Sequence, residues 1–297
     1  MNPEDAHALD TRRLEQFVAV ADAGTLAVAA ERLFITQQAL STALRQLERE
    51  VGVALFDRSG RRLVLTAAGQ ELLAGARPLL TGSRELARAV RRRAAGTPPA
   101  FVVGHSPALA DHEVFALLET AIRRHPDASV TLTQVFPGRF VDELLSGNLD
   151  LALRRGVDTP ADLTSAVIAY QPLRVAFSSK HRLAQRDRIA VRDLRDVPVT
   201  VWAPERHSFY TDFLIAHFRR NGVEPHLRVS RVQGAPPATA ALLDDDTCVF
   251  VTDPPGTCYG GRIVVRDFDD PPFSPVQALW LPHTVSALRA DILSAAP

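Results

Sequence analysis

Glutamine, arginine and hydroxyl side chains are concentrated in one short segment near the N-terminus. The set is Thr36, Gln37, Gln38, Ser41, Thr42 and Arg45. Glutamine can pair with N6 and N7 of adenine, and arginine with O6 and N7 of guanine. Hydroxyl groups suit phosphate oxygens, which position a protein on the duplex without reading its sequence. We therefore predict contact with double-stranded DNA, in which Gln37 and Arg45 read bases.

A second basic group lies a few residues further along the chain. Arg58, Arg61 and Arg62 stand between two short apolar runs, residues 53–56 and 63–65, and Gly60 lies among them. Such a pattern predicts a β-hairpin with a basic tip. Beside a helix-turn-helix this hairpin is a wing, whose arginines contact phosphate or the minor groove.

The elements that must carry these side chains are three short helices. Leu14, Phe17, Val18 and Ala21 form the apolar face of the first. Thr25 is the expected N-cap of the second and is included among the candidate DNA contacts. A third helix follows Thr36 and ends at Gly52. The layout predicts a helix-turn-helix whose last helix enters the major groove.

A long amphipathic helix is expected after Thr66. Its apolar residues recur every seven positions, which is typical of a helix pair formed between two chains. The predicted dimerisation residues are Leu72, Leu79, Leu86 and Val90. Pro78 predicts a bend in this helix. The alternative is an ordinary amphipathic helix that packs on its own chain.

The remainder of the chain alternates short apolar strands with helices. This order predicts mostly parallel, doubly wound sheets in two successive units, with a ligand cleft between them. We expect a DNA-binding domain at residues 1–69, a linker helix at 70–95 and an α/β domain at 96–297. The first subdomain is expected at about 100–168 plus 272–297, and the second at about 169–271.

The N-terminal residues resemble the LysR-type transcriptional regulators. The resemblance runs from Leu14 to Gly69 and includes Ala29-Ala30, Gln37 and Ser41, Leu47-Glu48, Leu55-Phe56-Arg58 and Leu65-Thr66. Weaker similarity continues through segments such as LLSGNLDLAL. The resemblance implies an all-α winged helix-turn-helix with a long linker helix, followed by a periplasmic-binding-protein-like α/β effector domain. It also implies a non-enzymatic, dimeric or tetrameric regulator that binds promoter DNA and a small metabolite.

The family's architecture also implies which residues line the effector site. They are His105, Ser106, Phe136, Arg139, Trp202, Arg206 and His207. Free N–H groups after Ser106 could hold a carboxylate, and Arg139 or Arg206 could supply the opposite charge. We therefore expect an organic anion as the effector and neither a cofactor nor a metal.

Three positions depart from the family pattern. Gln38 stands where proline is usual, and Thr42 stands where a basic residue or glutamine is usual. Both belong to the predicted reading helix, so we expect an operator that differs from the usual half-site. Residues 244–246 are three aspartates where a glycine-containing segment is common, and we expect an altered cleft wall there.

Two other functions compete with this interpretation. Ser106 and His105, with Asp111 nearby, suggest a hydrolase, although the chain has no G-x-S-x-G, HExxH or Walker A motif. Cys248 and Cys258 suggest a redox-responsive regulator, although Cys248 lies in the apolar run TCVFV, where thiols are usually unreactive.

Composition constrains where the protein works and what it binds. The 297 residues include 34 basic and 34 acidic ones, so the formal net charge is zero. Residues 1–95 hold 14 arginines and 11 acidic residues, a net +3 that the rest of the chain cancels. Zero net charge is therefore compatible with DNA binding by locally placed arginines.

The longest uncharged stretch, residues 271–288, contains four prolines and is unsuited to a membrane span. The acidic N-terminus lacks a signal-peptide core, so we expect a cytoplasmic protein.

Overall fold

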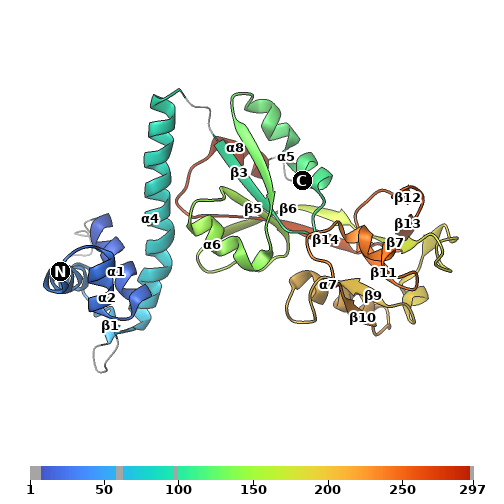
Figure 1. The fold of residues 1–297 in the computed structure, drawn as a ribbon, viewed down its shortest axis with the longest axis horizontal. Helices are drawn as coiled ribbons and strands as arrows, with labels where there is room; N and C mark the ends of the chain where they lie inside the picture. The colour runs from blue at the N-terminus through green and yellow to red at the C-terminus, as the bar shows by residue number, and fades with distance from the viewer. Residues whose placement is uncertain (1–7, 58–62, 97–99, 295–297) are drawn as a thin grey trace.

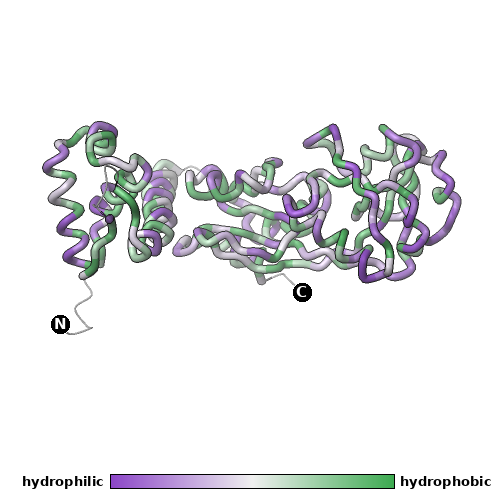
Figure 2. Tube along the Cα trace, turned by 90° about the horizontal axis from the view of Figure 1, so that it is seen from below, coloured by the Kyte–Doolittle hydropathy of each residue, from purple (hydrophilic) through white to green (hydrophobic). Residues whose placement is uncertain are grey.

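The computed structural model describes residues 8–57, 63–96 and 100–294. The chain forms a small helical domain, a long helix and an α/β domain with two sheets (Figure 1). Hydrophobic and hydrophilic stretches alternate along the chain in all three parts (Figure 2). Within the described residues, no helix is long and apolar enough to cross a membrane.

Three helices form the helical domain, and each begins or ends at a residue that satisfies its free backbone groups. They are α1 (Thr11–Ala23), α2 (Leu26–Arg32) and α3 (Gln37–Val51). Thr25 and Thr36 are the N-caps of α2 and α3, while Gly24 and Gly52 end α1 and α3 in the left-handed conformation that glycine favours. Leu14, Phe17, Leu40, Leu44 and Leu47 pack together beneath them. The predicted helix-turn-helix is therefore present.

A two-stranded hairpin follows α3. It consists of β1 (Phe56–Asp57) and β2 (Val64–Leu65), which pair antiparallel. The carboxylate of Glu48 on α3 accepts the backbone N–H groups of Leu55 and Phe56, at 3.0 and 3.4 Å, and so ties the hairpin to α3. The predicted tip arginines Arg58, Arg61 and Arg62 lie outside the described residues.

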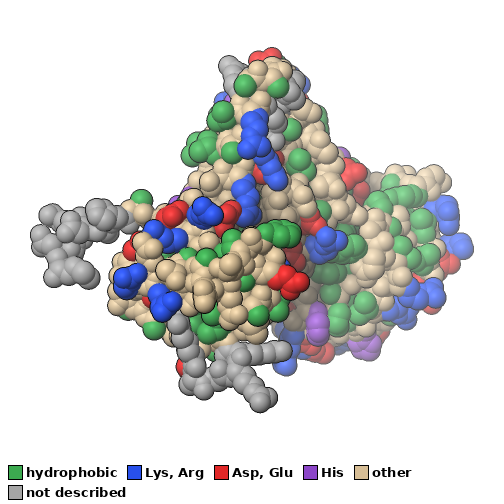
Figure 3. Space-filling view, turned by 60° about the vertical axis from the view of Figure 1, so that its left-hand side comes forward, with side chains coloured by type: hydrophobic (Ala, Val, Ile, Leu, Met, Phe, Trp, Pro, Cys, Tyr) green, Lys and Arg blue, Asp and Glu red, His purple; other side chains and the backbone are tan. Residues whose placement is uncertain are grey.

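The long helix α4 (Ala67–Ala94) is continuous through Pro78. Leu72 packs partly buried against the core of the helical domain. Leu79, Leu86 and Val90 are exposed, with relative accessibilities of 39, 68 and 62%. The helix also touches the α/β domain, because the Thr81 hydroxyl donates to the Leu145 carbonyl at 2.6 Å. Seen with the helical end forward, α4 and the helical domain carry scattered basic and hydrophobic side chains (Figure 3).

The first sheet of the α/β domain has the strand order β4-β3-β5-β14-β6. Its strands are β3 (Ala100–His105), β4 (Ser129–Gln134), β5 (Leu151–Arg155), β6 (Thr164–Pro172) and β14 (Phe273–Trp280). Helices α5 (Asp111–Arg124), α6 (Phe140–Leu145) and α8 (Ala287–Ser294), with the short 3-10 helix η1 (Pro137–Arg139), complete this subdomain. β3 lies parallel to β4 and β5, so the carboxyl ends of all three meet at one edge.

The second sheet has the order β10-β9-β11-β7-β13-β12, and β8 pairs with β13. Its strands are β7 (Arg174–Ser178), β8 (Arg188–Ile189), β9 (Val199–Val201), β10 (Leu227–Val229), β11 (Cys248–Val251), β12 (Gly256–Cys258) and β13 (Ile263–Phe268). Helix α7 (Phe209–Arg220) and the 3-10 helices η2 (Val191–Leu194) and η3 (Pro237–Leu242) complete it. β9 lies parallel to both β10 and β11.

The prediction of mostly parallel sheets is wrong for half of this domain. β14 runs antiparallel to β5 and β6, and β7 runs antiparallel to β11 and β13. The chain crosses from β6 into β7 and returns from β13 into β14, and the Leu173 N–H donates to the Pro272 carbonyl at 2.8 Å between these crossings. Because β6 pairs with β14 as far as Pro172, the first subdomain extends a few residues beyond residue 168.

Candidate DNA-reading surface and effector pocket

The first turn of α3 presents the side chains that were predicted to read DNA. The Thr36 hydroxyl accepts the N–H of Ala39 at 3.2 Å and so fixes where the helix begins. Gln37 and Gln38 are exposed in the first turn, and the nearby N–H groups carry the positive end of the helix dipole. Thr25 caps α2 in the same way, through the N–H of Val28 at 3.4 Å.

The next turn of α3 continues this surface. The Thr42 hydroxyl donates to the Gln38 carbonyl at 2.9 Å, and Nε of Arg45 donates to the Ser41 carbonyl at 3.3 Å. Thr42 and Arg45 are exposed, whereas Ser41 is half-buried. Thr42 and Arg45 also line a hollow that continues to Arg49 and Gly52. The sequence prediction missed Arg49, although it lies four residues after Arg45 and therefore on the same helix face.

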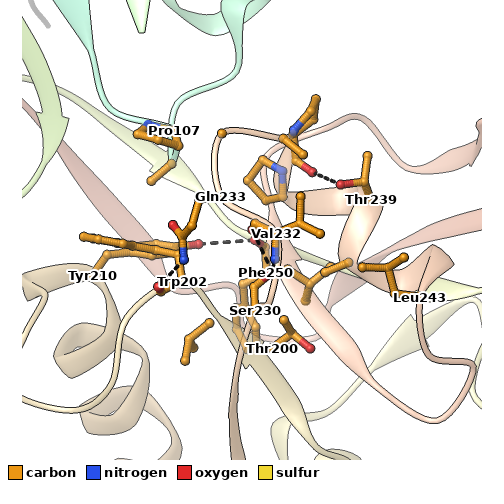
Figure 4. A pocket seen from close by; sticks show the side chains of 18 of the residues that line it. Pro107, Thr200, Trp202, Tyr210, Ser230, Val232, Gln233, Thr239, Leu243 and Phe250 are labelled. Carbon is orange, nitrogen blue, oxygen red and sulfur yellow. Dashed lines mark hydrogen bonds between the residues drawn. The ribbon is translucent and has the colours of Figure 1, made fainter. Parts of the chain in front are cut away.

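A pocket lies where the two subdomains of the α/β domain meet (Figure 4). It encloses about 630 Å³ of space that atoms do not fill, part of it open to solvent. Pro107 and Ala108, which follow β3, form the wall from the first subdomain. The second subdomain supplies the rest from five elements: the ends of β9 and β10, α7, η3 and β11. Its side chains include Thr200, Trp202, Tyr210, Ser230, Val232 and Phe250. The pocket thus lies at the carboxyl ends of parallel strands, where open α/β sheets bind ligands.

Most polar side chains of this pocket are already engaged within the protein. The hydroxyls of Tyr210, Ser230 and Thr239 donate to backbone carbonyls. The Gln233 side-chain amide donates to the Trp202 carbonyl at 3.2 Å. Burial raises the pKa of Tyr210 to about 12, so its phenol is uncharged at neutral pH. In contrast, the indole Nε1 of Trp202 is shut off from solvent without a hydrogen-bond partner in the described structure.

The structure separates the predicted effector residues into three groups. Trp202 lines the pocket, while His105 and Ser106 are buried immediately before its Pro107 wall. Phe136 and Arg139 line a different hollow at the end of β4, and Arg139 pairs with Glu143.

The remaining two, Arg206 and His207, are exposed and absent from the lining. The sequence prediction missed Thr200, Tyr210, Ser230 and Gln233. Thr200 and Ser230 could have been predicted, because they lie at or just after the ends of parallel strands, where such domains bind ligands.

A buried ion pair supports the wall of the pocket. Arg155, at the end of β5, donates to Glu113 of α5 at 2.9 Å and to the Ala108 carbonyl at 3.0 Å. Its guanidinium also lies 5.8 Å from the centre of the Tyr210 ring. Because Tyr210 belongs to the second subdomain, this contact joins the two subdomains beside the pocket. Nη1 of Arg155 is buried without a partner in the described structure.

The geometry does not assemble the hydrolase that was considered as an alternative. Nε2 of His105 lies 3.4 Å from Asp111. Ser106 Oγ and His105 Nδ1 are both buried, and neither has a hydrogen-bond partner within the described residues, so no Ser–His bond connects them. A serine nucleophile needs a base within hydrogen-bond reach.

The two cysteines lie on strands that are not neighbours. β11 carries Cys248 and β12 carries Cys258, and β7 and β13 lie between these strands. Three strand spacings place the thiols about 14 Å apart, whereas a disulfide requires Cα atoms about 6 Å apart. Burial raises the pKa of both thiols. The structure therefore does not favour the redox alternative.

Comparison with known proteins agrees with this two-part architecture. Residues 11–70 match the family described as bacterial regulatory helix-turn-helix protein, lysR family, and residues 94–292 match the LysR substrate binding domain. The chain is 30% identical over 211 residues to the HTH-type transcriptional regulator TfdT of Cupriavidus pinatubonensis, covering 71% of this chain and 92% of TfdT. It is also 30% identical over 231 residues to AlsR of Bacillus subtilis, covering 76% of each.

Solved structures show the same fold over nearly the whole chain. The crystal structure of CbnR, a LysR family transcriptional regulator, superposes with a TM-score of 0.57 at 24% identity, covering 97% of this chain and 100% of CbnR. A full-length OxyR variant from Pseudomonas aeruginosa gives 0.60 at 21% identity, covering 98% of this chain and 95% of OxyR.

The fold and both sites define a class of protein: a winged helix-turn-helix joined through a long helix to a two-subdomain ligand-binding domain. Members of this class are DNA-binding transcriptional regulators. The chain belongs to the LysR family.

Proposed function

We propose that a small molecule bound between the two subdomains of the effector domain modulates promoter binding by this regulator. One observation carries the proposal. The pocket has walls from both subdomains, which two chain crossings and contacts such as Arg155–Tyr210 connect. A ligand that contacts both walls stabilises one arrangement of the subdomains over others, which is how a ligand shifts a conformational equilibrium.

Three further parts of the function are included in this proposal. Gln37 and Arg45 read bases, and Thr36, Ser41 and Thr42 contact phosphate. The exposed Leu79, Leu86 and Val90 of α4 pair with a second copy of the chain to form a dimer or tetramer. Because its target is promoter DNA, the protein acts in the cytoplasm, and it catalyses no reaction.

A reporter experiment with a blocked pocket tests the central part of the proposal. Genome-wide mapping of bound DNA first identifies a target promoter, which is fused to a reporter and screened against metabolites. Val232 is partly exposed and lines the pocket, so Val232→Phe should fill it without disturbing the core. We expect this variant to bind the promoter but to lose the metabolite response.

A matched variant serves as the control. Val229 has similar exposure on β10 but does not line the pocket, so Val229→Phe should keep the response. Ala240 of η3 also lines the pocket, so Ala240→Phe is a second blocking variant. A metabolite response that survives both Val232→Phe and Ala240→Phe would place the effector elsewhere and overturn the proposal.

A further inference from the structure

The side chains that line the inter-subdomain pocket carry no charge in the part of the chain that the structure describes. Most of the wall is apolar or aromatic, and its principal members are Pro107, Trp202, Leu214, Val232, Pro236 and Phe250. Thr200, Ser230, Gln233 and Thr239 are polar but neutral. Burying an ionised ligand against such a wall is unfavourable unless a countercharge or several hydrogen bonds compensate.

Few hydrogen-bond donors of the pocket are free to bind a ligand. Ser230 and Thr239 donate their hydroxyl protons to the carbonyls of Val232 and Pro236, and the Thr200 hydroxyl lies 2.7 Å from that of Thr247. The indole N–H of Trp202 is closed to solvent and therefore to a ligand in the pocket. The pocket thus offers few groups that could compensate an ionised ligand.

The nearest buried cation is neutralised within the first subdomain. Arg155 is not part of the pocket lining, and its charge is balanced by Glu113 at 2.9 Å. The two arginines expected from the sequence to hold an anion lie elsewhere: Arg139 pairs with Glu143, and Arg206 is exposed outside the lining. The pocket therefore has no charged side chain in its lining that could pair with an anionic ligand.

We propose that the effector is an uncharged, largely apolar ring compound. This inference rests on the proposed function of the pocket and specifies its ligand class. It differs from the organic anion that the sequence suggested.

Matched pairs of neutral and anionic probes test the ligand class on the full-length protein. Benzamide and benzoate form one pair, methyl salicylate and salicylate a second, and phenylacetamide and phenylacetate a third, so that shape is similar while charge differs. The chain has two tryptophans, so Trp280→Phe leaves Trp202 as the only indole reporter. Titration of Trp202 fluorescence, checked by calorimetry, then gives the affinity of each probe.

We expect the neutral member to bind at least about tenfold more tightly than its carboxylate partner, which corresponds to about 1.4 kcal/mol. Val232→Phe should abolish that binding. Tighter binding of carboxylates that Val232→Phe also abolishes would overturn the neutral class and leave the proposed function standing. Binding that survives both Val232→Phe and Ala240→Phe would overturn the site itself. Failure of every probe in all three pairs to bind would overturn the neutral class.

Discussion

The guanidinium of Arg155 lies 5.8 Å from the centre of the Tyr210 ring and thereby connects the two subdomains beside their shared pocket. Each partner is held by its own subdomain. Arg155 is fixed by Glu113 and by the Ala108 carbonyl, whereas the Tyr210 hydroxyl donates to the Phe250 carbonyl at 3.3 Å. Ala108, Tyr210 and Phe250 all line the pocket. A ligand there consequently touches the groups that define how the subdomains meet.

Removing Arg155 should strongly destabilise the effector domain. Glu113 is buried, and Arg155→Met would leave its carboxylate without a cation, which typically costs about 3–5 kcal/mol. The double variant Arg155→Met/Glu113→Gln should lose less, because no buried charge remains. Urea unfolding measures both. Arg123→Met removes an exposed pair with Glu119 and should change stability by less than about 1 kcal/mol. Equal effects at the two arginines would contradict this account.

Gly69 should be indispensable for packing the hairpin against α4. A Cβ atom at this position would overlap the carbonyl oxygen of Leu55, which is backbone and cannot move aside easily. Gly69→Ala should therefore lower the thermal unfolding midpoint of the helical domain. Gly75 lies in the same helix and has open space where a Cβ atom would lie, so Gly75→Ala should raise stability by about 1 kcal/mol. A neutral Gly69→Ala variant would show that the hairpin can shift.

The helical domain could be predicted from sequence because its signals are local. Thr36 caps α3 and Gly52 ends it, and both lie within one turn of the residues that they define. The strands β6, β13 and β14 escaped prediction because their pairing is distant in sequence, as when Thr164 on β6 pairs with Trp280 on β14. Residues 272–297 were expected in the first subdomain, but no local signal shows that β14 runs antiparallel to its neighbours there.

The residues that line the pocket were harder to predict than the exposed face of α3 for the same reason. Ser230 and Gln233 lie in an irregular segment without periodicity, and Tyr210 faces the pocket from a helix whose pattern indicates only burial. Arg139 was expected to hold a ligand, yet Glu143 lies four residues later on the next turn and pairs with it. That spacing was visible in the sequence and favours a local ion pair.

The exposed apolar residues of α4 should hold two copies of the chain together. Leu86 and Val90 are 68 and 62% exposed, and residues this apolar are costly to leave in water along a helix. Leu86→Glu should shift the protein toward monomer in size-exclusion chromatography with light scattering. Arg91 is exposed on the other side of α4, and Arg91→Glu should leave the oligomeric state unchanged. Retention of the dimer in Leu86→Glu would remove this face from the interface.

Acid should weaken the second subdomain through His181. Its ring stacks on Phe177 at 4.7 Å, and its Nδ1 accepts the N–H of Leu183 at 3.1 Å, which only the unprotonated nitrogen can do. Burial chiefly lowers the pKa of His181, Arg182 lowers it further, and Asp246 opposes them.

Because the folded pKa lies below the unfolded value of about 6.5, the unfolded state binds more protons there and stability falls as pH drops below that value. The thermal midpoint should thus decline from pH 7 toward lower pH, and His181→Phe should decline less steeply. Identical slopes in the two proteins would contradict the assignment.

Gln37 should contribute to sequence recognition more than to general DNA affinity. It occupies the first position of α3, is exposed, and follows the Thr36 cap at the helix end that we propose enters the major groove. A bidentate contact with adenine discriminates by about 1–3 kcal/mol. Gln37→Ala should therefore lower the ratio of specific to non-specific affinity by about 5- to 150-fold at fixed salt.

The comparison requires a glutamine outside the reading helix. Gln70 is exposed on α4, so Gln70→Ala removes the same side chain and should leave that ratio as in the unmodified protein. Fluorescence anisotropy with the mapped operator and with a scrambled duplex gives both affinities. If Gln37→Ala weakens binding to both duplexes equally, Gln37 contacts phosphate and Arg45 remains the candidate base reader, because its Nη groups extend beyond the Nε–Ser41 bond.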